Sequence, residues 1–180
     1  DGHPIIIGGI AKGAGMIYPN LATMLCFLAT DADIDEDLLQ TALHRAVDDS
    51  FNMIAVDHDM SPNDTVALLA NGLANNKPIK ANTPAAQMFQ SALSEVCIFL
   101  AKQIASDGEG ATKLIEVVVE GAMSIADAKI AARAIVASPL VKAAIHGSSP
   151  NWGRIITALG QSEVELVISK IDLCLGDLCL

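Results

Sequence analysis

The sequence predicts a mixed α/β (α+β) fold, in which helices pack on a mixed sheet. Its 180 residues are 52% hydrophobic but only 3% aromatic, so the core must be built from Ala, Val, Ile, Leu and Met. Segments of strand length intermingle with segments of helical periodicity, and no regular βαβ repeat is present. The length suffices for one sizeable core or for two small lobes.

The expected strands are short, apolar and rich in β-branched residues. The clearest is TMLCFLAT at 23–30, and a strand at 4–10 gives way to a loop at 12–22. Segment 113–122 has good β propensity and partly alternates between apolar and polar residues. Further strands are expected at 52–56 and within 164–180, and segment 65–72 fits either a second buried strand or a short helix.

The expected helices carry recognisable start signals. In segment 31–51, Asp33 or Asp35 can cap a helix whose first turn is acidic. Thr83 caps the next helix, with Pro84 at its first position. Three more helices are expected towards the C-terminus, at 124–138 ended by Pro139, at 140–147 and at 151–160.

The charge balance argues against two classes of partner. The net charge is −10 and the pI is near 4.6, whereas nucleic-acid binding needs clustered Lys and Arg. We expect no membrane partner, because there is no basic amphipathic stretch and every long apolar stretch is interrupted. The first residues lack the pattern of a signal peptide. We therefore expect a cytoplasmic protein, or an organellar one if the source is eukaryotic.

The spacing of the cysteines, histidines and glycines does not match a known metal-binding or phosphate-binding motif. The cysteines are scattered and are expected to be reduced; they are Cys26, Cys97, Cys174 and Cys179. The sequence DHD at 57–59 is expected to be a solvated or capping turn. GGIAKGAG at 8–15 lacks the residues of a phosphate loop, and is expected to be a turn whose glycines adopt positive φ. No metal and no cofactor are predicted.

Thr23 stands between a deformable segment and a firm strand, which suits a nucleophile that is released by cleavage of its own chain. The hydroxyl would attack the preceding carbonyl, and water would cleave the resulting ester. The freed α-amine, with an ordinary pKa of about 7.7–8.0, could then act as the general base. From composition alone, a threonine that simply opens a strand is the commoner interpretation.

Five stretches of the sequence favour the interpretation of Thr23 as a catalytic nucleophile. They are GGIAKGAGMIYPNLATML at 8–25, SPNDTVALLANG at 61–72, SDGEGATK at 106–113, ASPLVKAAIHGSSPNWGRIITALG at 137–160 and VELVISKIDLCLGDL at 164–178. In this order they closely resemble the ornithine acetyltransferases, also called bifunctional glutamate N-acetyltransferase/amino-acid acetyltransferase. The resemblance covers almost the whole chain.

The resemblance implies a self-cleaving Thr-nucleophile acyltransferase architecture. The precursor would be cut between Ala22 and Thr23, so that 1–22 ends an α chain and 23–180 forms a β chain that stops before the family's C-terminus. Thr23 would take an acetyl group from N-acetylornithine and pass it to glutamate, a ping-pong reaction of arginine biosynthesis. Acetyl-CoA is an alternative acetyl donor in some relatives.

The resemblance also assigns individual residues. Lys12 and Glu109 match substrate-binding positions, and Thr23 both binds substrate and carries the acetyl group. Asn63 and Asp64 are expected to brace the structure rather than to react.

Asn151 is expected to cap the helix that Trp152 helps to start. Other features of the family would lie outside the chain or concern its assembly. The family's Thr-Gly oxyanion pair would precede Asp1, and a substrate-contacting tail would follow Leu180. Since an oxyanion donor contributes ~10²–10³-fold to kcat, the 180 residues alone should be nearly inactive. The cleaved chains are expected to stay together as a hetero-oligomer.

Two alternatives remain open at this point. One is a Thr-nucleophile aminopeptidase or amidohydrolase of the same architecture, which would pass the acyl group to water. The other is an inactive fragment, acting at most as an assembly partner, whose uncovered apolar surface drives self-association.

Overall fold

The computed structural model describes residues 4–18, 21–22 and 24–180, and at 21–22 it describes the backbone only. It divides into two compact units, Asp1–Gly110 and Ala111–Leu180. The strands are β1 (Ile7–Lys12), β2 (Ile17–Tyr18), β3 (Leu21–Ala22), β4 (Leu25–Thr30), β5 (Thr65–Ala70), β6 (Cys174–Leu175) and β7 (Leu178–Cys179). The helices are α1 (Glu36–Asp48), α2 (Pro84–Ser106), α3 (Ile125–Ala137), α4 (Pro139–His146) and α5 (Trp152–Gly160), with short 3-10 helices η1 (Phe51–Met53) and η2 (Ile168–Lys170).

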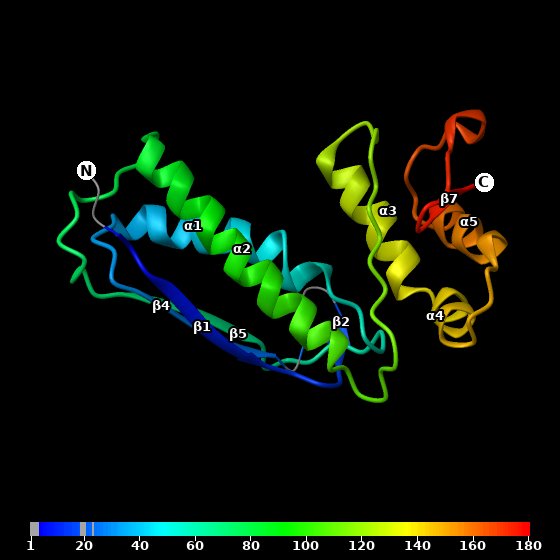
Figure 1. Cartoon of the computed structure of the whole chain (residues 1–180), viewed down its shortest axis with the longest axis horizontal. Helices are drawn as coiled ribbons and strands as arrows, with labels where there is room; N and C mark the ends of the chain where they lie inside the picture. The colour runs from blue at the N-terminus through cyan, green and yellow to red at the C-terminus, as the bar shows by residue number, and fades with distance from the viewer. Residues whose placement is uncertain (1–3, 19–20, 23) are drawn as a thin grey trace. The chain divides into compact units, whose positions relative to one another are not determined.

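The first unit contains the predicted mixed sheet, with strand order β1-β4-β5. β1 runs antiparallel to β4, and the register extends from Ile7 opposite Thr30 to Lys12 opposite Leu25. β5 runs parallel to β4, with α1 in the connection between them (Figure 1). The strand predicted at 23–30 is therefore confirmed over β4, and segment 65–72 forms a strand rather than a helix.

The helices of this unit begin where their sequence signals lie. Asp35, one of the two expected caps, accepts the Leu38 N–H at 3.1 Å at the start of α1. Thr83 accepts the Ala86 N–H at 3.2 Å, with Pro84 in the first turn of α2. Figure 1 shows both helices on the same side of the sheet.

The core of the first unit lies between these helices and the sheet. Alternate residues of β4 point inward and meet the buried side of α2, where Leu93 is fully buried. Cys26 and Cys97 are both fully buried and free, which confirms the prediction that they are reduced. Burial raises the pKa of the Cys26 thiol to about 11, and burial together with the nearby Cys26 raises that of Cys97 to about 12.

The opposite face of the sheet is apolar and exposed. Phe27 of β4 is 48% exposed, its cross-strand partner Ile10 is 72% exposed, and Leu69 of β5 is 62% exposed. The exposure of this face follows from strand alternation, because the residues that alternate with these three along the strands point to the other face and fill the core. A second layer would be needed to bury it.

The described residues of segment 12–22 include strands that the predicted loop did not. β1 extends to Lys12, and β2 and β3 form a small hairpin in which Ile17 lies opposite Ala22. The prediction of positive φ at the glycines of 8–15 is wrong, because none of them is among the glycines that adopt it. Instead, the missing Cβ of Gly9 leaves room for the Leu28 side chain, and that of Gly15 leaves room for carboxylates.

Segment 52–56 does not form the expected strand. Its first residues belong to η1, which α1 leads into. The Val56 N–H still donates to the Ile17 carbonyl at 2.8 Å, so the end of the segment is tied to β2 by a backbone hydrogen bond.

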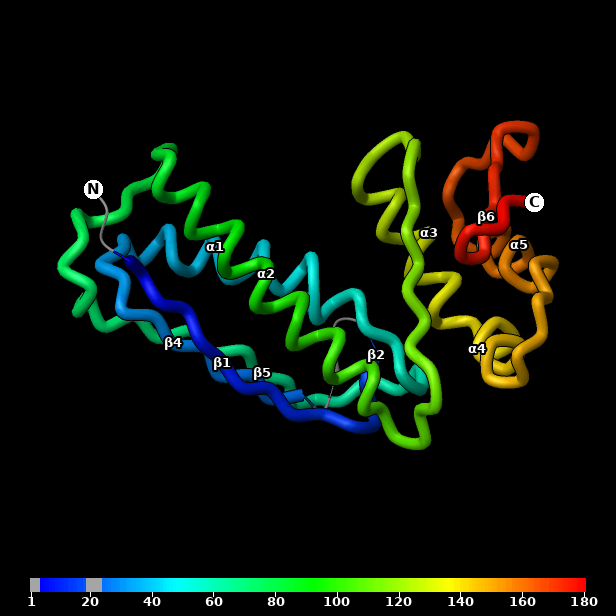
Figure 2. The backbone as a smooth tube through the Cα atoms, in the orientation of Figure 1, coloured from blue at the N-terminus to red at the C-terminus, as the bar shows by residue number. Residues whose placement is uncertain are grey.

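The second unit is built around α3, α4 and α5, all three of which were predicted (Figure 2). Its small core contains Ile135, Val141, Ile155 and Ala158. Ser138 ends α3 and also caps α4, accepting the Val141 N–H at 3.4 Å.

Two local predictions fail in this unit. Segment 113–122 pairs with no other strand among the described residues, because β propensity needs a partner edge to become a strand. Lys113 at its start instead donates from Nζ to the Ile145 carbonyl and to Ser148 Oγ, both at 2.6 Å. Asn151 occupies the N-cap position of α5 without a side-chain cap bond, and Trp152, the first residue of α5, is exposed.

The C-terminal cysteines correct the prediction that all four are reduced. β6 and β7 form a hairpin in which Cys174 lies directly opposite Cys179. Their Cα atoms are 4.0 Å apart and their sulfur atoms are bonded. The spacing of five residues gave no metal pattern, but a tight turn between them makes it suitable for a disulfide.

Candidate functional site

Lys12 ends β1 at the edge of an open hollow. The strand register places it opposite Leu25, the first residue of β4. Its side chain is exposed and lines a hollow of about 610 Å³, together with residues near the end of α2 such as Gln103 and Asp107. A cation is therefore held beside the start of β4, with room for a small molecule next to it.

Glu109 comes to the same loop from the other end of the first unit. It lies just beyond α2, and its N–H donates to the Ala14 carbonyl at 2.7 Å. A methyl group added at Gly15 would meet Glu109 Oε2 at 2.8 Å and Asp57 Oδ2 at 3.5 Å. The fold thus brings the predicted acidic residue onto the loop that Lys12 begins.

The structure describes the residues on either side of Thr23, the residue that follows the predicted cleavage point. Thr23 lies outside the described residues. The backbone of Ala22 pairs with Ile17, and the Met24 N–H donates to Asp64 Oδ1 at 2.9 Å. The chain on either side of Thr23 is therefore tied to other segments.

Asp57 is a site residue that the sequence did not single out. The turn at 57–59 was expected to be solvated or capping, but Asp57 accepts three backbone N–H groups. Those of Met16, Ile17 and Asp59 lie at 2.6, 3.1 and 3.1 Å from its carboxylate. The capping part of the prediction is correct within the turn; the contacts with the distant hairpin had no local signal.

Asp64 braces the chain as expected, through its hydrogen bond with Met24. Burial raises the pKa of its carboxyl group above the ordinary value, and the hydrogen bond from the Met24 N–H opposes that rise. Asn63 makes a different contact, with its N–H 3.3 Å from Ser61 Oγ.

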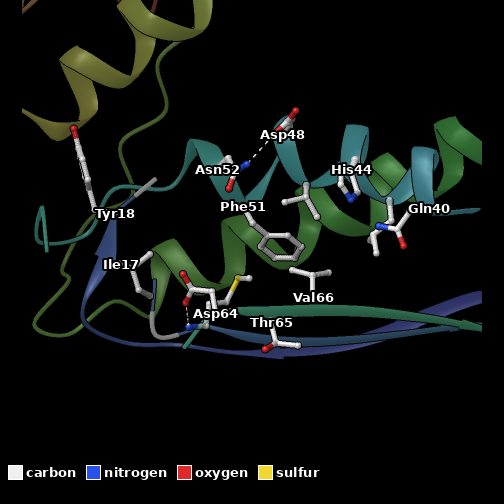
Figure 3. Close-up of a pocket in the computed structure, with 13 residues that line it drawn as sticks. Ile17, Tyr18, Gln40, His44, Asp48, Phe51, Asn52, Asp64, Thr65 and Val66 are labelled. Atoms are coloured by element: carbon white, nitrogen blue, oxygen red, sulfur yellow. Dashed lines mark hydrogen bonds between the residues drawn. The ribbon is translucent and has the colours of Figure 1, made fainter. Parts of the chain in front are cut away.

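Asp64 also lines a pocket of about 370 Å³ between α1 and the sheet (Figure 3). Val66 points from β5 towards Phe51 inside it, while Thr65 points to the other side of the strand. Met24 lines the same pocket, so it opens next to the predicted cleavage point. Its volume falls within the range of small-molecule sites.

Neither a metal site nor a membrane span is found among residues 4–18, 21–22 and 24–180. No three His, Cys, Asp or Glu side chains gather closely enough to hold an ion. None of the helices described combines the length and apolarity needed to cross a bilayer.

Comparisons with known proteins agree closely with one another. The ArgJ family model matches residues 2–180. The arginine biosynthesis bifunctional protein ArgJ of Dehalococcoides mccartyi (strain CBDB1) is 52% identical over 177 residues, and that of Symbiobacterium thermophilum is 54% identical over 177 residues. Each alignment covers 98% of this chain and 44% of the relative, so the chain spans less than half the length of these curated relatives.

A solved structure is also similar to this chain. The crystal structure of arginine biosynthesis bifunctional protein ArgJ from Bacillus halodurans superimposes with a TM-score of 0.83 at 48% sequence identity. The match covers 85% of this chain and 72% of that one.

Proposed function

Because the chain belongs to the ArgJ family, we propose that it carries the nucleophile of an acetyltransferase of arginine biosynthesis. The enzyme moves an acetyl group from N-acetylornithine to glutamate through an ester on Thr23. It first cleaves itself between Ala22 and Thr23. Acetyl-CoA is a second possible donor, and no resident cofactor is needed.

The observation that carries this proposal is the hydrogen bond between the Glu109 N–H and the Ala14 carbonyl. It brings an acidic side chain to the loop that follows Lys12. An amino acid presents a carboxylate and an ammonium group, and this loop offers one partner for each. Lys12 would bind the carboxylate and Glu109 the ammonium group.

Self-cleavage proceeds as an acyl shift followed by hydrolysis. The Thr23 hydroxyl oxygen bonds to the Ala22 carbonyl carbon, the peptide C–N bond breaks, and the hydroxyl proton passes to the Thr23 nitrogen. Water then adds its hydroxide to that carbonyl carbon and returns a proton to the threonine oxygen. The products are a carboxylate on Ala22 and a free α-amine on Thr23.

Acetyl transfer uses the same hydroxyl twice. The α-amine accepts the Thr23 hydroxyl proton as the oxygen attacks the acetyl carbonyl, and it gives that proton to the departing ornithine amine. Glutamate's neutral amine then attacks the ester, the threonine oxygen leaves with a proton, and N-acetylglutamate is released. The ester stores the acetyl group between two different amines.

The two cleaved chains, ending at residue 22 and beginning at residue 23, would remain associated. β1 lies before the cut and β4 after it, yet the two strands pair along six positions. This pairing supports a heteromer of the two chains. Cytoplasmic localisation stays a prediction: the reduced Cys26 and Cys97 agree with it, whereas the Cys174–Cys179 disulfide is unusual for a reducing compartment.

The proposal is tested on the complete gene product that contains these 180 residues. Intact mass and N-terminal sequencing should reveal a fragment that begins Thr-Met-Leu-Cys. Purified enzyme should convert N-acetylornithine and glutamate into ornithine and N-acetylglutamate, and Thr23→Val should abolish both cleavage and transfer. Release of free acetate with no N-acetylglutamate would indicate the hydrolase alternative, and an uncleaved, inactive product would reject both.

A further inference from the structure

We propose that the carboxylates of Asp57 and Asp64 position the backbone for self-cleavage by holding it on either side of Thr23. The inference rests on the proposed function. It assigns a task to the turn 57–64, which the substrate-binding residues leave unexplained. Neither residue is a reacting group; both act through the backbone.

The upstream side is held by Asp57. Its carboxylate accepts the N–H groups of Met16 and Ile17 at 2.6 and 3.1 Å. The Val56 N–H donates to the Ile17 carbonyl at 2.8 Å, so both polar groups of this residue are engaged. Ile17 in turn lies opposite Ala22 in the β2–β3 hairpin. Asp57 therefore anchors the strand against which Ala22 is paired.

The downstream side is held by Asp64 in the same manner. Its Oδ1 accepts the Met24 N–H at 2.9 Å, and the Thr65 N–H donates to the Met24 carbonyl at 3.0 Å. Figure 3 shows the first of these bonds as a dashed line beside the pocket. Both polar groups of the residue after Thr23 are thereby engaged.

Two-sided anchoring matters because the acyl shift is sensitive to geometry. The hydroxyl must approach the preceding carbonyl carbon in a near-attack arrangement, and a misplacement of about 1 Å can cost ~10²-fold in rate. The anchors come from residues 40 or 41 positions away in sequence. They are therefore absent until the first unit folds, which would confine cleavage to the folded chain.

The two carboxylates differ in how many oxygens they use. Asp57 uses both, with Oδ2 facing Met16 and Oδ1 shared by Ile17 and Asp59. Asp64 uses only Oδ1 for the backbone of Met24. An asparagine has one acceptor oxygen and one NH₂ donor group. Asparagine can therefore replace Asp64 but not Asp57, where its NH₂ would face a backbone N–H.

The test measures self-cleavage of the complete gene product over time, by electrophoresis and intact mass. We expect Asp64→Ala and Asp57→Asn to slow cleavage by about 10- to 100-fold. Asp64→Asn should recover most of the wild-type rate. Asp59→Ala is the matched control, because this exposed residue lies in the same turn and only its backbone contacts Asp57. Tm is measured for every variant.

Hydroxylamine adds a readout that separates a slow acyl shift from a slow hydrolysis of the ester. It cleaves esters and so accelerates scission wherever the ester has formed. If the carboxylates position the attacking group, the slow variants form little ester and hydroxylamine does not rescue them. Should Asp64→Ala lower Tm, Asp64→Glu keeps the charge but displaces the acceptor, and should cleave slowly at wild-type Tm.

The outcomes separate the two proposals. Wild-type cleavage rates in Asp57→Asn and Asp64→Ala, with cleavage still abolished in Thr23→Val, would overturn the positioning roles and leave the proposed function intact. Equal slowing in Asp64→Ala and Asp64→Asn would also overturn the hydrogen-bond argument. A wild-type product that never cleaves would overturn both proposals together.

Discussion

Gly15→Ala should separate substrate binding from folding at the proposed site. The added methyl would lie 2.8 Å from Glu109 Oε2, whereas ordinary contact begins at 3.4 Å. The carboxylate must therefore retreat by roughly half an ångström, and Glu109 is exposed enough to do so. Gly15 does not adopt positive φ, so alanine is tolerated there and the free energy of unfolding should change by less than about 1 kcal/mol.

The effect should appear in catalysis instead. Since a displacement of about 1 Å can cost ~10²-fold, half of that should lower kcat/KM for glutamate by about 10-fold. The assay is acetyl transfer from N-acetylornithine to glutamate by the complete gene product, with Tm measured in parallel. Gly8→Ala is the matched control, because its added methyl would meet nothing within 4 Å. Wild-type kcat/KM in Gly15→Ala, or an equal loss in both variants, would refute the reasoning.

Three further predictions concern the first unit. Leu93→Ala, which empties a fully buried site, should lower the free energy of unfolding by about 2–5 kcal/mol in denaturant titrations, and a loss below about 1 kcal/mol would contradict the packing described. Cys26 and Cys97, with pKa raised to about 11 and about 12, stay protonated at pH 8; they should resist alkylation until the protein unfolds, as peptide mass mapping would reveal. Phe27→Glu should reduce self-association of the isolated 180-residue chain in native mass spectrometry, whereas Phe99→Glu on α2 should not; equal behaviour would reject the sheet face as the contact surface.

Local sequence signals predicted the elements that depend on local physics. Asp35 and Thr83 cap α1 and α2 because their side chains reach backbone groups only three residues away. Within the apolar run, residues 25–30 form a central strand because they can be buried on one face and paired on both edges. The caps in particular depend only on residues that are close in sequence.

The failed predictions depend on which segments the fold places next to one another. Segment 113–122 has the composition of a strand, but the part of the chain that the structure describes offers it no neighbouring edge to pair with. The disulfide between Cys174 and Cys179 needed the turn that places them opposite each other. The glycines of 8–15 were expected to provide positive φ, but Gly9 makes room for Leu28 and Gly15 for the Glu109 carboxylate.

The candidate site divides in the same way. Lys12, Thr23 and Glu109 could be named from the sequence, because the resemblance rests on contiguous motifs that contain them. The hydrogen bond between Glu109 and Ala14, and those between Asp57 and the β2–β3 hairpin, could not be predicted from the sequence. Each of them joins segments that are many residues apart. The sequence by itself determines which chemical groups are present and which turns and helix caps form locally. Which distant groups lie in contact is decided only when the shared core is buried.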